Sequence, residues 1–168
     1  YDGRPFMETT LNNGFLQAEN RNDMQFYLMW ANHDVLNLWD TRLYDCKEDN
    51  VIWRGQVDRE EFEKICKRNI EKYFKQPNYY KIDGKPVYMI FDFDNFIRSF
   101  GTTQKCKAAI EEFRRKTVEA GFDGLHFQVV HWSGRTYGWL NDDDECKGVD
   151  AYKLFDYLGI DSVTSYNW

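Results

Sequence analysis

Four short clusters of aromatic and polar residues each follow an apolar run with the character of a β-strand. The four segments are FYLMWANHD (26–34), VYMIFDFDNF (87–96), LHFQVVHW (125–132) and SVTSYNW (162–168). Aromatic rings can stack on a sugar, and Asn, His and Asp can bind its hydroxyl groups. If the strands are parallel, all four clusters lie at one edge of a sheet, where such folds bind ligands. The sequence therefore predicts a glycan site there.

The candidate substrate-binding residues are the side chains that end these four runs. Trp30 is interpreted either as a stacking platform or as packing at the top of the sheet, and Asn32 either as a hydroxyl ligand or as an Asx turn. Asp34 can accept a hydroxyl hydrogen bond, and it can act as a general acid or base if its pKa is raised. The full set is Trp30, Asn32, His33, Asp34, Asp92, His131, Trp132, Tyr166, Asn167 and Trp168.

Two acidic residues follow the second strand run at an interval of two. In an extended chain, Asp92 and Asp94 point to the same face, and we expect Asp92 to lie over the site. Asp94 and Asn95 are expected to form a turn and a helix cap. A D-x-D pattern also occurs in glycosyltransferases, where it holds a metal ion and a nucleotide sugar. The pattern is too short to decide between these interpretations.

Helical patterns alternate with the strand runs. We expect one helix over 6–19, weakened by Gly14, and others that begin at Asp58, at Thr102 or Thr103, and at Asp150. Pro77, Gly121 and Gly159 should end the last three. Asp83-Gly84 should form a turn before the second strand. The expected parallel strands are 25–31, 87–92, 125–130 and 162–166, adjacent in that order.

Alternating strands and helices allow an open doubly wound sheet or a (β/α)8 barrel. No G-x-G-x-x-G or P-loop motif follows any strand, so a nucleotide-binding open sheet loses its main support. A whole barrel needs roughly 250 residues. Residues 1–168 are therefore expected to form a single domain, an incomplete barrel that lacks its first and last strands. Unpaired edges would then favour self-association.

One connection is far longer than the others. Residues 35–57 carry Trp39, Tyr44 and Trp53, which suits either a binding loop or a lid that packs its own rings. These two alternatives stay open.

Charge and cysteine content exclude several classes of protein. The net charge of −6 and the lack of a basic stripe argue against a nucleic-acid partner, and no apolar run is long enough to span a membrane. No cofactor or metal site is expected, because no C-x-x-C pair occurs and the acidic run 141–145 lacks calcium-loop spacing. Cys66 and Cys106 should be buried thiols, whereas Cys46 and Cys146 could pair.

Several segments resemble one family of glycan-active proteins. WANHDVLNLWD (30–40), YYKIDGKPVYMIFDF (79–93), GFDGLHFQVV (121–130) and LGIDSVTSYNW (158–168) are similar to family 99-like glycoside hydrolases and their WbsX-like relatives. The resemblance extends from about Gly14 to Trp168. It implies a (β/α)8 barrel that acts on mannose- or rhamnose-rich polysaccharide, and it favours a periplasmic or extracellular bacterial protein.

The chain departs from the family pattern at two points. His33 and Asp34 stand where relatives often carry Glu, and the acidic N-E-W-x-E-G-T motif is expected on a strand beyond Trp168. No catalytic residue can therefore be assigned in this chain. We expect glycosidic hydrolysis by the full-length protein. A metal-dependent sugar transferase and a non-catalytic carbohydrate-binding module are the alternatives.

Overall fold

The computed structural model describes residues 8–37, 51–132 and 137–165. Its centre is a parallel sheet in the order β1-β5-β6-β7, formed by Leu28–Trp30, Lys85–Ile90, His126–Val130 and Ser162–Thr164. All three pairings on this path are parallel. The predicted strand order and direction are confirmed, and the protein is an α/β fold with helices between parallel strands.

Two antiparallel hairpins extend from this sheet. Lys81–Ile82 (β4) pairs with the start of β5 around the predicted turn, in which Asp83 and Gly84 both have positive φ angles of 48° and 73°. Val35–Leu36 (β2) pairs with Val51–Trp53 (β3), so the long connection contains a hairpin that the sequence did not predict. Trp39 and Tyr44 lie outside the described residues.

Side-chain caps begin the helices as the sequence predicted. The carboxylate of Asp58 accepts a hydrogen bond from Glu61 N at the start of α1 (Arg59–Arg68), and Asp150 caps α4 (Ala151–Leu158) in the same way. Thr102 caps α3 (Thr103–Glu119). The chain continues from α1 as a π-helical segment, η5 (Asn69–Phe74). The range of helix α2 (Phe93–Phe100) was not predicted, although a helix cap was expected at Asp94 or Asn95.

The amino-terminal helix is shorter than expected. In place of one helix over 6–19, the structure has a π-helical turn, η1 (Thr10–Gly14), and a 3₁₀ turn, η2 (Phe15–Gln17). A second 3₁₀ turn, η3 (Arg21–Asp23), precedes β1. Gly14 lies at the junction of the first two, consistent with its poor helix propensity.

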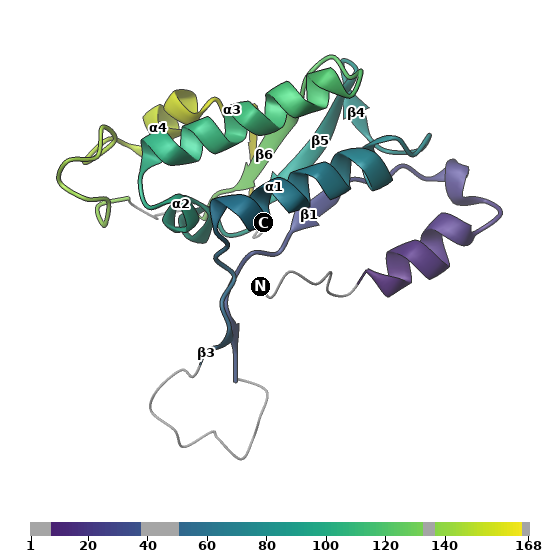
Figure 1. Ribbon diagram of the computed structural model, residues 1–168, viewed down its shortest axis with the longest axis horizontal. Coiled ribbons are helices and arrows are strands. Elements are labelled where there is room, and N and C mark those ends of the chain that lie inside the picture. Colours follow the sequence, from purple (N-terminus) through teal and green to yellow (C-terminus); the bar gives the residue numbers. More distant parts are fainter. Residues whose placement is uncertain (1–7, 38–50, 133–136, 166–168) are drawn as a thin grey trace.

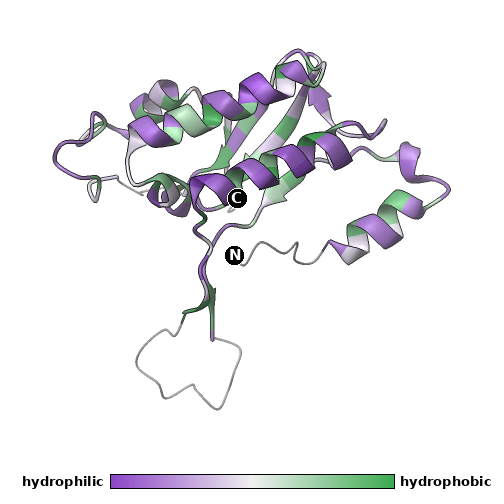
Figure 2. Ribbon diagram, viewed as in Figure 1, coloured by the Kyte–Doolittle hydropathy of each residue, from purple (hydrophilic) through white to green (hydrophobic). Residues whose placement is uncertain are grey.

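The core lies between the sheet and the helices. Figure 1 shows α1 and α3 crossing one side of the sheet, and Figure 2 shows that their outer surfaces are largely hydrophilic. Tyr88, Ile90 and Phe127 are buried in this core with Phe62 and Phe113. Aromatic side chains therefore supply much of the packing in this core. On β1, Met29 points to the opposite face of the sheet from Leu28 and Trp30 and is 40% exposed.

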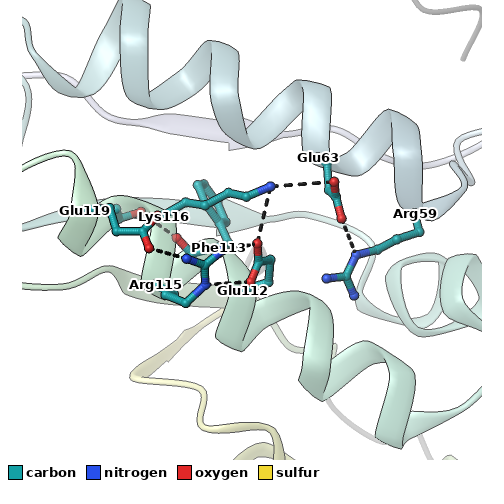
Figure 3. A network of polar contacts seen from close by, with 8 residues as sticks. Arg59, Glu63, Glu112, Phe113, Arg115, Lys116 and Glu119 are labelled. Carbon is teal, nitrogen blue, oxygen red and sulfur yellow. Dashed lines mark hydrogen bonds and ion pairs between the residues drawn. The ribbon is translucent and has the colours of Figure 1, made fainter.

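Helices α1 and α3 are also joined at their surface by a network of charges (Figure 3). Lys116 of α3 lies 3.6 Å from Glu63 of α1 and 3.4 Å from Glu112 of its own helix. Hydrogen bonds from Arg115 lower the pKa of Glu112 to about 2. Such acids stay ionised and paired at neutral pH, so this cluster does not resemble a general acid–base site.

Candidate functional site

The carboxyl ends of the four central strands lie next to one another. Trp30 pairs with Ile90, and Val130 pairs with Thr164. The residues that follow these positions therefore emerge at the same edge of the sheet, as the parallel order requires. The structure brings most of the described candidate residues to this edge, although it divides them among several environments.

Asn32 is buried and locked onto the end of β5. Its Nδ2 donates to the carbonyl oxygen of Asp92 at 2.6 Å, and its Oδ1 accepts from Asp92 N at 2.7 Å. Only 1% of Asn32 is exposed. The amide group continues the pairing of β1 and β5 beyond the last strand residues. The side chain of Asn32 therefore has a structural role: it holds the two strand ends together.

Asp92 caps helix α2. Its Oδ1 accepts from Asn95 N at 3.0 Å, the arrangement by which an acidic side chain satisfies a free amide at a helix start. We expected Asp94 or Asn95 to supply the cap; the structure gives that role to Asp92. The helix itself buries Phe93, Phe96 and further apolar residues at helical spacing, and this spacing was the signal for it.

Asp34 faces the β2–β3 hairpin. Its Oδ1 accepts from Gly55 N at 2.7 Å and from Asn95 Nδ2 at 3.3 Å. Only glycine lets the backbone at position 55 come this close to residues 32–34, because a Cβ at that position would lie 2.1 Å from Asn32 O. In the described part of the chain, Oδ2 of Asp34 accepts no hydrogen bond. One oxygen thus fixes the carboxylate, and the other can accept a hydroxyl group.

A row of three rings crosses the same edge. His33 meets Phe91 edge to face at a centroid distance of 5.5 Å, and Phe91 meets Trp132 at 5.7 Å. His33 is exposed, and the other two rings are partly exposed. Phe91 was not among the predicted site residues, because it ends an apolar strand run and was interpreted as core. The row joins the ends of β1, β5 and β6.

Trp30 and His131 point instead toward the helices. The Trp30 ring stacks on Phe62 at 6.1 Å, and the His131 ring lies 5.3 Å from the ring of Phe155 in α4. Strand alternation explains the division, since Trp30 shares its face of β1 with Leu28, which packs against the core. The structure thus favours the packing interpretation of Trp30. Three further candidates, Tyr166, Asn167 and Trp168, lie outside the described residues.

The acidic run 141–145 supplies a structural clamp. Buried Asp144 accepts hydrogen bonds from Thr103 N at 2.8 Å, Thr103 Oγ1 at 2.5 Å and Cys146 N at 2.9 Å. Burial raises the pKa of Asp144, but these hydrogen bonds outweigh burial and leave it below its ordinary value. Over residues 8–37, 51–132 and 137–165, no group of three His, Cys, Asp or Glu side chains is arranged to hold a metal ion.

Two further expectations concern cysteines and membranes. Cys66 and Cys106 are buried thiols, as predicted, and burial raises the pKa of both. Cys146 is also buried, and Cys46, its possible partner, lies outside the described residues. None of the described helices has the length and apolar character needed to cross a membrane.

Comparison with known proteins gives one match. A family model described as "Glycosyltransferase WbsX" matches residues 1–163, nearly the whole chain. No curated protein and no solved structure matches this chain. The match agrees with the WbsX-like resemblance of the sequence.

Proposed function

This chain belongs to the WbsX glycosyltransferase family, and we propose that it binds its glycan at the carboxyl ends of β1, β5 and β6. The observation that carries the proposal is the row of His33, Phe91 and Trp132 beside Asp34. Partly exposed rings can stack on the apolar face of a sugar. Asp34 follows His33 in the chain, and its second carboxylate oxygen can accept a hydroxyl hydrogen bond.

We propose that the chain forms part of a (β/α)8 barrel. The sequential parallel order of the four strands supports this architecture, in which ligands bind where the candidate residues gather. Strands β1 and β7 end the described sheet path, so their outer edges are available for further strands or a second copy. Sedimentation at increasing concentration tests the predicted self-association of the isolated chain: concentration-dependent dimers are expected, and a monomer at all concentrations contradicts it.

The proposed reaction of the full-length protein is hydrolysis of glycosidic bonds in mannose- or rhamnose-containing polysaccharide. Sugar transfer is the second candidate, because the family description names a glycosyltransferase. The role of Asp92 as a helix cap weakens the idea that Asp92 and Asp94 clasp a metal-bound nucleotide. Glycoside hydrolases usually employ two carboxyl groups, and no such pair can be assigned here.

An assay of the full-length protein distinguishes the two reactions. Mannan and rhamnan oligosaccharides are incubated with the protein, with and without nucleotide sugars and Mn²⁺. Hydrolysis predicts new reducing ends in the absence of nucleotide sugar. Elongated products that require the nucleotide sugar would instead establish transfer. Binding without either product would support the third alternative, a carbohydrate-binding module.

A further inference from the structure

A second polar site lies next to the strand-end site, at the carboxyl end of α2. An open hollow of about 270 Å³ is lined by Gln56, Arg98, Gly101, Trp139 and Asn141. These residues come from three parts of the chain: the segment before α1, the carboxyl end of α2 and the connection before α4. Its volume is below the range typical of drug-sized ligands, so it suits one small group or one sugar ring.

Arg98 supplies an available positive charge in this hollow. Its guanidinium carbon lies 3.8 Å from the centroid of the Trp139 ring, which fixes the plane of the group by a cation–π contact. Among the described residues, no carboxylate forms an ion pair with Arg98. A planar guanidinium held by its face presents its N–H groups at the edge, the geometry that binds a carboxylate through two parallel hydrogen bonds.

The other lining side chains add neutral donors rather than competing charges. Gln56 and Asn141 each carry an amide group, and Gly101 leaves space because a Cβ there would meet nothing within 4 Å. Two acids of the adjacent loop are engaged elsewhere. Asp142 lies 3.2 Å from Lys147, and Asp144 is turned inward to Thr103.

Gln56 also connects the hollow to the strand-end site. Its Nε2 donates to Asn95 Oδ1 at 3.3 Å, and Asn95 Nδ2 contacts Asp34 Oδ1. A glycan that lies over Asp34 can therefore continue across Asn95 and Gln56 toward Arg98. The two sites are neighbours on one polar surface.

We propose that this hollow binds the carboxylate of an acidic sugar, a hexuronic acid residue of the glycan. The choice of a sugar acid rests on the proposed function, whereas the anion site rests on Arg98 and its surroundings. Binding requires no metal and no covalent step. The carboxylate would be held by the Arg98 fork, with the amides of Gln56 and Asn141 contacting ring hydroxyls.

Titrations of the isotope-labelled chain, followed by NMR, test the proposal with three probes. Methyl β-glucuronide and methyl β-glucoside differ only in the carboxylate, and acetate provides the carboxylate without the sugar. We expect the glucuronide to shift the signals of Arg98, Trp139 and Gln56 and to bind at least about tenfold more tightly than either other probe. Equal affinity for glucuronide and glucoside, or for glucuronide and acetate, would overturn the proposal.

Two variants of the hollow and one control complete the test. Arg98→Gln removes the charge, and Asn141→Asp places a repelling charge at the exposed rim; each should abolish the glucuronide shifts. Lys105→Gln makes the same charge change as Arg98→Gln on exposed α3 and should leave the affinity unchanged. Because Asn141 is exposed, its variant keeps the test valid if Arg98→Gln fails to fold. Retained glucuronide binding in folded Asn141→Asp would contradict the assignment.

The outcomes separate this inference from the proposed function. If neutral mannose oligosaccharides shift signals at Asp34 and Trp132 but glucuronide leaves Arg98 unchanged, only the acidic-sugar site is wrong. If glucuronide binds at Arg98 while no oligosaccharide affects Asp34 or Trp132, the strand-end proposal fails instead.

Discussion

Asn32 and Asp92 exchange two hydrogen bonds across the ends of β1 and β5. The last backbone contact between these segments runs from Phe91 N to Trp30 O at 3.1 Å, and the side-chain amide of Asn32 then bonds both the N–H and the C=O of Asp92. An amide side chain here reproduces the donor and acceptor of a peptide group. Asn32 therefore fixes the ends of β1 and β5 to each other at the edge of the polar site.

Replacing Asn32 should destabilise the fold. Asn32→Ala leaves the N–H of Asp92 without its partner and removes one of the two hydrogen bonds that the C=O of Asp92 accepts, so we expect a loss of about 1–3 kcal/mol in the free energy of unfolding. Urea denaturation measures this change. Asn20→Ala is the matched control, because Asn20 is exposed and its side chain makes no capping hydrogen bond; a change within about 0.5 kcal/mol is expected. Equal stability of both variants would contradict the structural role of Asn32.

Gly55 should tolerate no side chain. A Cβ there would lie 2.1 Å from Asn32 O and 2.6 Å from the His33 carbonyl carbon, so Gly55→Ala must move the backbone that follows β3 away from the end of β1. We expect a loss of about 1–3 kcal/mol by thermal or urea unfolding, as for other overpacked sites, and weaker glycan binding through displaced Asp34.

Gly14→Ala is the control for this substitution. Nothing lies within 4 Å of a Cβ at Gly14, and alanine has the higher helix propensity. Its stability should stay unchanged or rise by up to about 1 kcal/mol. If Gly55→Ala is as stable as Gly14→Ala, the close packing of Gly55 against the backbone of Asn32 is contradicted.

The Asp144 clamp predicts a pH-dependent contribution to stability. Asp144→Asn removes charge-assisted hydrogen bonds to Thr103 and should cost about 1–3 kcal/mol at pH 7. Because folding lowers the pKa of Asp144, this contribution is complete above the unfolded pKa of about 3.9 and is lost as pH falls through the folded value. Unfolding curves at pH 7 and at pH 2–3 should show the difference between the two proteins shrinking.

Asp143→Asn provides the comparison for that experiment. Asp143 is exposed in the same loop, and its side chain has no hydrogen bond among the described residues. Its effect should stay within about 0.5 kcal/mol at both pH values. If the loss of stability caused by Asp144→Asn is the same at both pH values, the shape of the side chain, rather than its charge, stabilises the contacts with Thr103 and Cys146.

Strand positions and several helix starts could be predicted because they depend on local signals, and the order of the strands followed from their alternation with helices. Apolar runs marked the strands, and Asp58, Thr102 and Asp150 cap helices as their residue types suggest. The start of helix α2 was predicted incorrectly, because its cap residue, Asp92, was assigned to the site. The regular spacing of Phe93, Phe96 and Phe100 indicated a helix that starts directly after β5.

The candidate site was predicted only in its location. The strand positions placed its residues at one edge of the sheet. The face to which each side chain points depends on which residue is the last of its strand, because successive side chains point to opposite faces. Trp30 and His131 point to the helix layer, whereas Phe91 joins His33 and Trp132. The contact between Asp34 and Gly55 depends on a hairpin whose path the sequence pattern does not specify.

The most direct test of the proposed glycan surface is an NMR titration of the isotope-labelled chain with mannose oligosaccharides. We predict that the signals of His33, Asp34, Phe91, Gly55 and the Trp132 indole shift together. Trp132→Ala should weaken binding by about tenfold, since an aromatic contact contributes on the order of 1 kcal/mol beyond its buried area. The absence of shifts at these residues, or shifts confined to the opposite end of the sheet near Asp83 and Asp123, would contradict a glycan surface at the strand ends.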